Sequence, residues 1–379
     1  MIDVVRLPDP DAAWRDQLRR GVRTVDALEA AIHLTESERE GALRAIAGGF
    51  PMAITPYYLS LADRDDPRCP IRLQCVPRRE EGEASPGDME DPLGEEDPRH
   101  AVAPDLVCRY PDRALLLVTD RCSVYCRFCT RSRMVGSDGG ARSLDGLEPA
   151  MKWLEANPQV EEVIVSGGDP LTLSDERIGA VLSRLRRIRS IGVVRVATRT
   201  PVTLPMRITD ALCRTLARFH PIWVMTHFNH PAECTDEAMA ACERLADHGM
   251  PVMNQAVLLS GVNSCACVLE KLFRRLVRSR VKPYYLLQCD PVSGTGHLRT
   301  RTDVGLRIVE ALQGRLSGIA MPRLILDAPG GEGKVPLSPD FVVSRSPDEL
   351  VVRTWRGVDV AYPERRTEEL RPRTCACGS

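Results

Sequence analysis

The sequence predicts an α/β protein whose parallel sheet forms either a whole or partial barrel or an open, doubly wound sheet. Three observations indicate this class. Strand-like and helix-like segments alternate from residue 113 to residue 329, nearly every strand-like segment ends in polar or glycine-rich residues, and a helical stretch precedes the alternation. Repeated strand–helix units place successive strands parallel, with right-handed crossovers. In a barrel the chemistry gathers where the strands end.

Helices are expected in residues 14–61, because TVDALEAAIHL and TESEREGALRAIAGGF carry apolar residues at three- and four-residue spacing. Thr35 and Glu38 have the spacing of a capping box. The next stretch, RREEGEASPGDMEDPLGEEDPRH, is acidic, rich in Pro and Gly, and poor in large apolar residues. We expect it to be a solvated surface connection. Residues 1–100 therefore form a helical region followed by an acidic connecting loop.

The core of the fold is predicted for residues 101–328. The candidate strands are RALLLVTD, VEEVIVSGG, VVRVATRT, IWVMTHF, PVMNQAVLL, PYYLLQCD and PRLILDAP. Amphipathic helices lie between most of them: DERIGAVLSRLRRI, TDALCRTLARF, TDEAMAACERLADHG, SCACVLEKLFRRLVRS and TDVGLRIVEALQGRL. The strands lead into a cysteine loop, SGGDP, TRTP, THFNHP, NQ, QCD and DAPGG. A purely structural barrel would not need these polar ends.

The overall composition favours small-molecule chemistry. Lys and Arg number 51 and Asp and Glu 52, so the net charge of -1 predicts neither nucleic-acid binding nor a basic membrane patch. The N-terminal residues have no charged-then-apolar leader and the chain has no long apolar run, which argues against secretion and a membrane span. A cytoplasmic location is expected. There, the 14 cysteines favour metal ligation or catalysis over disulfides.

Three thiols gather in CSVYCRFCTRSR, directly after the first core strand. Cys122, Cys126 and Cys129 have the spacing C-x3-C-x2-C, with no fourth cysteine nearby. Three thiolates can hold three irons of a 4Fe–4S cluster and leave the fourth iron open. Structural zinc would need a distant fourth ligand, and unliganded core thiols are a third interpretation. The spacing favours the open cluster.

A second candidate site is the lysine in DAPGGEGKVPL. Lys334 follows Gly330, Gly331 and Gly333, directly after an apolar strand. A lysine on a glycine loop at a barrel mouth can form an imine with an aldehyde cofactor, which requires a neutral amine. The alternative is an exposed lysine without a role.

The cysteine spacing, with Phe128 before the last cysteine, resembles the radical S-adenosylmethionine (radical SAM) superfamily. Further segments occur in the order and at the spacing of lysine 2,3-aminomutases: WRDQLRRGVRTVDAL, MAITPYYLSL, RYPDRALLLVTDRCSVYCRFCTR, SGGDPL, RTPVTLPMRIT, THFNHP, LLSGVNSC, PYYLLQCD and DAPGGEGKVPL. This resemblance implies a partial parallel (β/α) barrel of the radical SAM type with an N-terminal helical segment and a C-terminal extension. It implies an isomerase that interconverts L-lysine and L-β-lysine (3,6-diaminohexanoate) with a 4Fe–4S cluster, SAM and pyridoxal 5′-phosphate (PLP).

The resemblance also implies roles for the matched residues. The cluster would be held by Cys122, Cys126 and Cys129, and PLP by Arg109, Tyr110 and Arg113, with Lys334 as the Schiff-base lysine. SAM would lie near Ser166, Gly167, Gly168, Asp169, His227 and Gln255. Arg131 would grip the substrate carboxylate, and Asp290 and Asp327 would receive the far ammonium of lysine.

The two aspartates limit the choice of substrate. Two carboxylates in a sheltered pocket repel unless a cation joins them, which disfavours a neutral or acidic substrate tail. A guanidinium could also satisfy both, so arginine 2,3-aminomutase chemistry is an alternative, as is modification of a protein lysine. An alternative of another class is a non-catalytic iron–sulfur or zinc protein.

Residues 329–379 would carry the lysine loop and a C-terminal extension. Clostridial-type relatives bind zinc between subunits through GVN-x-C and a C-terminal C-x-C-x2-C, and Cys265, Cys375 and Cys377 match three of those ligands. The last ligand is missing, since the chain reads CACGS there, although Cys267 is an extra thiol that could substitute. The resemblance thus implies zinc and a homo-oligomer as expectations. The other expected partners are an amino acid substrate and a reducing electron donor.

Overall fold

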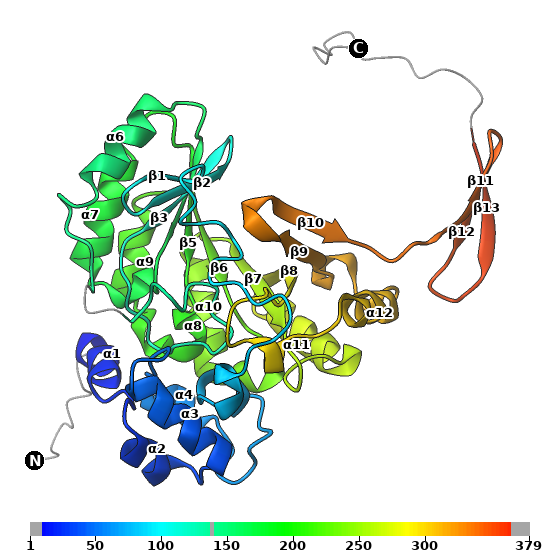
Figure 1. Cartoon of the computed structure of the whole chain (residues 1–379). Coiled ribbons are helices and arrows are strands. Elements are labelled where there is room, and N and C mark those ends of the chain that lie inside the picture. Colours follow the sequence, from blue (N-terminus) through cyan, green and yellow to red (C-terminus); the bar gives the residue numbers. More distant parts are fainter. Residues whose placement is uncertain (1–9, 137–139, 365–379) are drawn as a thin grey trace, which may run out of the picture.

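The computed structural model describes residues 10–136 and 140–364. Its centre is a curved ten-stranded sheet in the order β1 to β10 (Figure 1). The strands are β1 (Ala101–Ala103), β2 (Leu106–Tyr110), β3 (Arg113–Leu117), β4 (Glu162–Ser166), β5 (Val193–Ala197), β6 (Ile222–Thr226), β7 (Val252–Leu258), β8 (Val281–Gln288), β9 (Arg323–Ala328) and β10 (Gly333–Leu337). Strands β3 to β9 run parallel, whereas β1, β2 and β10 pair antiparallel at the edges. The predicted α/β class is confirmed, and the barrel is partial because the sheet does not close.

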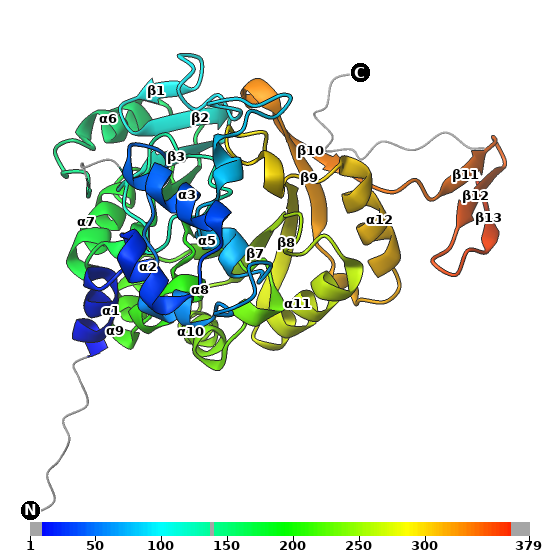
Figure 2. The ribbon, with the colours of Figure 1, turned by 60° about the horizontal axis from the view of Figure 1, so that its bottom comes forward.

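Successive parallel strands are joined through helices on the outer face of the sheet (Figure 2). These are α6 (Glu148–Ala156), α7 (Asp175–Leu185), α9 (Asp210–Ala217), α10 (Asp236–Asp247), α11 (Ala266–Arg278) and α12 (Thr302–Leu312). Ser174, Thr209 and Thr235 cap α7, α9 and α10, each accepting a backbone N–H from the third residue after it. All the core strands and helices expected from the sequence are present. Most have shorter ends, whereas β8 begins two residues before the predicted segment.

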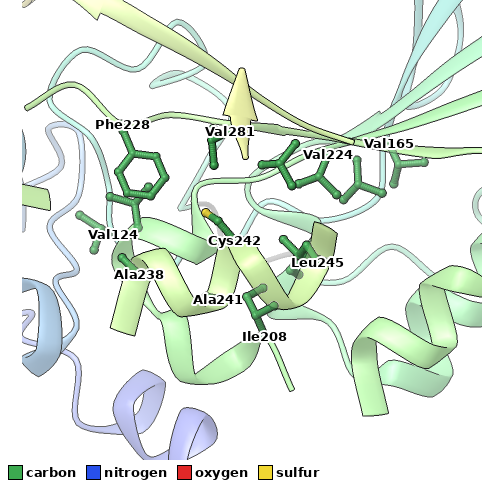
Figure 3. Packing of buried hydrophobic residues seen from close by; sticks show 14 of the residues in the cluster. Val124, Val165, Ile208, Val224, Phe228, Ala238, Ala241, Cys242, Leu245 and Val281 are labelled. Carbon is green, nitrogen blue, oxygen red and sulfur yellow. The ribbon is translucent and has the colours of Figure 1, made fainter. Parts of the chain in front are cut away.

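Side chains alternate between the two faces of the sheet. On β5, Val194 and Val196 are fully buried in the core, whereas Arg195 and Ala197 face the inside of the curve. Figure 3 shows the outer layer, where strand valines such as Val224 pack above α10. The outer face thus supplies stability, and the inner face is free to carry polar groups.

Short helices cover one end of the barrel in the N-terminal region: α1 (Pro10–Arg19), α2 (Val25–Ala31), α3 (Glu36–Ile46), α4 (Pro56–Ser60) and α5 (Arg72–Cys75). The predicted capping box is confirmed, since Thr35 and Glu38 exchange both bonds at the start of α3. Glu38 also forms a fully buried ion pair with Arg72 (2.6 Å). Residues 14–61 are therefore helical in large part, as predicted.

The prediction of a solvated connection is wrong for part of the acidic stretch. Residues 92–95 are buried, and Leu93 and Glu95 are only 7% and 4% exposed. The carbonyl of Pro92 accepts the N–H of Gly330 (2.9 Å), so this segment lies against the glycine loop before Lys334. Composition alone indicated a surface loop because the glutamates of PLGEE have charged partners that are distant in sequence.

A second sheet follows the barrel: β11 (Val342–Arg345), β12 (Glu349–Arg353) and β13 (Asp359–Pro363) pair antiparallel and project from the body (Figure 1). The ring of Trp355 lies over Gly314, just after α12. Remaining short helices are α8 (Thr200–Thr203) and the 3-10 turns η1 (Arg79–Gly82), η2 (Pro170–Thr172), η3 (Pro205–Arg207), η4 (Pro231–Glu233), η5 (Gly296–Leu298), η6 (Gly318–Ala320) and η7 (Pro329–Gly331). Within the described residues, no helix is long and apolar enough to cross a membrane.

Candidate active site

A cavity of about 810 Å³ lies inside the curve of the sheet. All the residues predicted for the cluster, the cofactors and the substrate line it: Arg109, Tyr110, Arg113, Cys122, Cys126, Cys129, Arg131, Ser166, Gly167, Gly168, Asp169, His227, Gln255, Asp290, Asp327 and Lys334. They come from segments more than 200 residues apart in sequence. The structure therefore brings the three thiols and the lysine loop to a single cavity.

The cysteine loop follows β3, and Arg127 within it is anchored to the N-terminal region. The Arg127 guanidinium donates to the carbonyls of Phe50 (3.1 Å) and Pro51 (2.9 Å) and to Glu81 (2.9 Å). Within the loop, the N–H of Cys129 donates to the carbonyl of Cys126 (3.0 Å). The N-terminal helical region thus fixes the loop with its three cysteines toward the cavity.

The three thiols are partly buried and lie close to one another. Burial raises the pKa of Cys122 well above its usual value, and negative charge on Cys129 and Cys126 raises it further. Burial likewise raises the pKa of Cys129 to about 11, with Cys126 adding to the effect. A metal cation bound by these thiols would stabilise their thiolate forms.

The three thiols are the predicted ligands of the cluster. Among residues 10–136 and 140–364, no group of three or more His, Cys, Asp or Glu side chains is placed to hold one metal ion. In a cubane cluster each cysteine ligates a separate iron. The assignment of Cys122, Cys126 and Cys129 to three irons stays a prediction.

The glycines of SGGDP permit a close approach between the end of β4 and the cysteine loop. A Cβ atom at Gly167 would lie 2.2 Å from the carbonyl oxygen of Thr119, and one at Gly168 would lie 2.3 Å from that of Arg121. Gly167 also has a φ of +123°, which L residues rarely adopt. The absence of side chains at these glycines allows the backbone that leads into the cysteine loop to pack against them.

Asp169 is buried and braces the ends of two strands. Its carboxylate accepts hydrogen bonds from the Thr198 hydroxyl (2.6 Å) and from the backbone N–H groups of Arg199 (2.7 Å) and Leu171 (3.0 Å). Burial raises its pKa, which these bonds oppose. Its predicted place near SAM stays a prediction, and its carboxylate contacts the residues just after β5 and the turn that Asp169 itself begins.

His227 and Gln255 both line the cavity. His227 directly follows the end of β6, and Gln255 lies on β7. Burial lowers the pKa of His227 to about 3, and the positive charges of Arg199, Arg131 and Lys334 lower it further. The imidazole is therefore neutral at physiological pH. Its buried Nδ1 atom has no hydrogen-bond partner among the described residues, so it is available to a polar ligand.

Lys334 lies on edge strand β10, opposite Asp327 on β9. Its ammonium forms an ion pair with the Asp327 carboxylate, and its backbone N–H donates to the hydroxyl of Tyr110 (2.9 Å). Arg109 pairs with the same carboxylate (3.5 Å), and the Arg113 guanidinium lies 4.0 Å from the centre of the Tyr110 ring. Tyr110 thus contacts Lys334 and lies beside both arginines, a set that fits a phosphate-bearing aldehyde.

The two predicted substrate aspartates are neighbours. Burial raises the pKa of Asp290 to about 7, and the charge of Asp327 raises it further, against the opposing effects of Lys334 and Arg109. A cation placed between these carboxylates would favour the ionised form of both. The pocket therefore suits a positively charged group.

Sequence reasoning missed Glu95. Its two carboxylate oxygens each accept a hydrogen bond from the Arg131 guanidinium (2.8 Å both), while the third nitrogen of that guanidinium lies 3.4 Å from the hydroxyl of Ser166. The Glu95 side chain is 2% exposed. In the sequence, Glu95 lies in PLGEE, where an apolar residue and a glycine interrupt an acidic stretch. This pattern does not indicate that Glu95 pairs with Arg131.

Of the thiols considered for zinc, the structure describes Cys265 and Cys267, and neither lines the cavity. Cys265 and Cys267 are exposed at the start of α11, with their sulfurs 2.9 Å apart. Cys375 and Cys377 lie outside the described residues. The predicted zinc site therefore remains a prediction.

Comparison with known proteins gives two family matches. A model described as "Radical SAM superfamily" matches residues 116–267, and one described as "Lysine-2,3-aminomutase" matches residues 309–375. The first range contains the cysteine loop and the second contains Lys334.

Whole-chain relatives agree with these matches. "L-lysine 2,3-aminomutase" of Bacillus subtilis (strain 168) is 46% identical over 358 residues, covering 94% of this chain and 75% of the relative. The protein of the same description from Fusobacterium nucleatum subsp. nucleatum is 45% identical over 364 residues, covering 95% and 85%. "Glutamate 2,3-aminomutase" of Clostridioides difficile (strain 630) is 43% identical over 344 residues, covering 91% and 81%.

Proposed function

Because the chain belongs to the lysine 2,3-aminomutase family of radical SAM enzymes, we propose that it is an isomerase that interconverts L-lysine and L-β-lysine by moving the amino group between C2 and C3. One observation carries the proposal. The three thiols, the Lys334 amine and the Asp290–Asp327 pair face a single cavity. Radical generation, amine capture and recognition of a distant cation therefore take place within reach of one substrate.

The residues fit three cofactors. Cys122, Cys126 and Cys129 would each hold one iron of the 4Fe–4S cluster, and SAM would lie beside the open iron and His227. PLP would be held by Lys334 and by Arg109 and Arg113, which lie beside Tyr110. When bound, these groups supply a carbon-centred radical and an aldehyde for the migrating nitrogen, which no side chain provides. The chain positions them and shields the cavity from water.

The polar groups of the cavity would fix the two ends of lysine. The Arg131 fork suits the carboxylate, and Asp290 with Asp327 suits the far ammonium. Lys334 and the substrate ammonium would compete for Asp327, and that carboxylate would be free for the substrate while Lys334 holds PLP. A glutamate side chain would place a third carboxylate beside two others, which disfavours the reaction for which the C. difficile relative is named.

The test is the product formed from each amino acid. Purified protein, reconstituted with iron, sulfide and PLP, is incubated anaerobically with SAM, dithionite and L-lysine, L-arginine, L-glutamate or a lysine-containing protein. We expect β-lysine as the dominant product. Dominant β-arginine would replace our substrate assignment, because a guanidinium also satisfies both aspartates.

Borohydride reduction tests the PLP assignment separately. Reduction after addition of PLP should leave a pyridoxyl group on Lys334, located by peptide mass spectrometry. The K334A variant should lose this adduct, whereas K282A should keep it, because the Lys282 ammonium donates to the Met321 carbonyl (2.9 Å) outside the cavity. An adduct on other lysines alone would refute the role of Lys334.

The proposal also includes an electron donor, a zinc ion and a homo-oligomer. A cellular reductant would deliver the electron to the cluster, and zinc would join Cys265 to the C-terminal cysteines of an oligomer. Metal analysis of the full chain and of its C265S and C267S variants tests the zinc site. Zinc retained by both variants would exclude these thiols as ligands.

A further inference from the structure

Arg199, in the RTP sequence after β5, makes a contact that the proposed reaction leaves unexplained. Its Nη1 donates to the Sγ atom of Cys126 at 2.7 Å. The side chain is only 9% exposed, and the guanidinium lies 5.2 Å from the centre of the Phe128 ring, within the cysteine loop. A charged donor therefore reaches one predicted cluster ligand directly.

The rest of the guanidinium is held by fixed acceptors. Nη2 donates to Gln74 Oε1 (2.6 Å), Glu233 Oε1 (2.7 Å) and the Tyr58 hydroxyl (3.0 Å), and Nε donates to the carbonyl of His227 (3.2 Å). These acceptors come from the N-terminal helices and from the loop after β6. Because every nitrogen is used, the direction of the bond to Cys126 is set by the surrounding structure.

The counter-charge is equally fixed. The second carboxylate oxygen of Glu233 accepts the backbone N–H groups of Asn229 (2.6 Å) and His230 (2.8 Å), and Glu233 is fully buried. A buried charge pair of this kind costs solvation free energy that an apolar pair would avoid. Its position beside a predicted ligand sulfur points to an electronic role.

We propose that Arg199 raises the reduction potential of the cluster by donating a charged hydrogen bond to the thiolate of Cys126, an inference that rests on the cluster assignment in the proposed function. The cluster accepts one electron and so becomes more negative by one charge. Donors to ligand sulfurs and nearby positive charge stabilise the more negative form. Arg199 is thus a positioning residue that acts through Cys126 on the electron transfer that precedes SAM cleavage.

The electrostatics give two variants with opposite expected effects. R199M removes the donor and the charge, so the midpoint potential should move to a more negative value, by at least about 59 mV, a tenfold change in a one-electron equilibrium. E233Q keeps Arg199 but removes its counter-charge, so the potential should move to a more positive value. A merely structural role would not reverse the sign.

The potential is measured by electron paramagnetic resonance during an anaerobic dithionite titration of the reconstituted protein, without lysine, PLP or SAM. A chain that holds a cluster but does not isomerise lysine still gives this readout, so failure of the proposed reaction and failure of this inference are distinguishable. R72M is the matched control, because Arg72 is equally buried and paired with Glu38. It should leave the potential unchanged.

R199K should give a shift in the same direction as R199M but smaller, since it keeps the charge without the planar fork. If R199M holds too little iron for titration, E233Q and R199K decide the question. Unchanged potentials in both, or a negative shift in E233Q, would overturn the proposal. Equal shifts in R199M and R72M would do the same.

Discussion

At the scale of single residues, the charged groups of the cavity are already engaged with partners that resemble parts of the substrate. Glu95 offers Arg131 the carboxylate that an amino acid would offer, and Lys334 offers Asp327 an ammonium. When the substrate carboxylate replaces Glu95 on Arg131, the displaced Glu95 carboxylate keeps, among the described residues, only its longer ion pair with Arg133 (3.9 Å). Substrate entry therefore costs part of the pairing of a buried charge. Binding strength then depends on the difference between similar pairs.

Asp290 should give substrate binding a pH dependence. Its pKa is raised to about 7, chiefly by burial and then by Asp327. The raised pKa contributes folding stability that is fully present below the unfolded pKa of about 3.9 and is lost as the pH rises through about 7. Binding of an ammonium favours the ionised form, so the KM for L-lysine should fall as the pH rises from 6 to 8. Measured KM profiles should lose this component in D290N, and an unaltered profile would contradict the assignment.

Replacement of Glu95 should strengthen substrate binding. E95Q removes the charge that competes for Arg131, so the KM for L-lysine should fall, by roughly fivefold to tenfold, since about 1.4 kcal/mol corresponds to tenfold in affinity. E96Q is the control, because Glu96 is 59% exposed and pairs only at the surface with Arg133 (3.1 Å). A KM that rises in E95Q would show that Glu95 orients Arg131 and does not compete with the substrate.

At the scale of elements, the site depends on close contacts between strand ends. The end of β4 packs on the cysteine loop through Gly167 and Gly168, and Asp169 ties that end to β5. The outward residues of the same strands bury against the helices, as the valines of Figure 3 show. Stability and chemistry therefore use opposite faces of each strand, and the two can be altered separately.

G168A tests this contact. The added Cβ would lie 2.3 Å from the Arg121 carbonyl oxygen and would push the cysteine loop away, at a cost of about 1–3 kcal/mol for overpacking. We expect less iron per chain after reconstitution, together with a lower melting temperature. G318A provides the control, because a Cβ there meets nothing within 4 Å. Normal iron content in G168A would show that the loop can shift without losing the cluster.

At the scale of the whole molecule, one short segment connects the two halves of the site. Residues 92–95 contact Arg131 through Glu95, Arg109 through the Leu93 carbonyl (3.2 Å) and the lysine loop through Pro92. The sheet β11–β13 lies outside this unit and exposes apolar side chains, namely Val342, Val343, Val358, Val360 and Tyr362. Large contiguous apolar patches mark interaction surfaces, and we expect the proposed oligomer to use this sheet.

A chain that ends after Ser338 should separate assembly from cofactor binding. All residues that line the cavity precede this point, so pyridoxyl trapping on Lys334 should persist. The proposed oligomer should dissociate, because the truncation removes the exposed sheet. Light scattering would give the mass of each form. A truncated chain that assembles like the full chain would show that the subunit contact lies elsewhere.

Much of the fold follows from local patterns. The core strands and helices obey the periods of two and 3.6 residues that burial on one face imposes. The cysteine loop and the lysine loop indicated chemistry because the residues that form each motif lie close together in sequence. Hairpin β1–β2 and strand β10 were missed, because edge strands gain their pairing from neighbours that sequence periodicity does not reveal.

By itself, the sequence determined the α/β class and the position of the cysteine loop, because each is encoded in neighbouring residues. The candidate residues of the cavity came from the resemblance of the sequence to lysine 2,3-aminomutases. Only the tertiary structure decided that Glu95 pairs with Arg131, that Arg199 donates to Cys126, and that the acidic connection is partly buried. These partners lie 36 and 73 residues apart. Pairing at such separations depends on how the folded chain excludes water from each charge, and no local pattern specifies that.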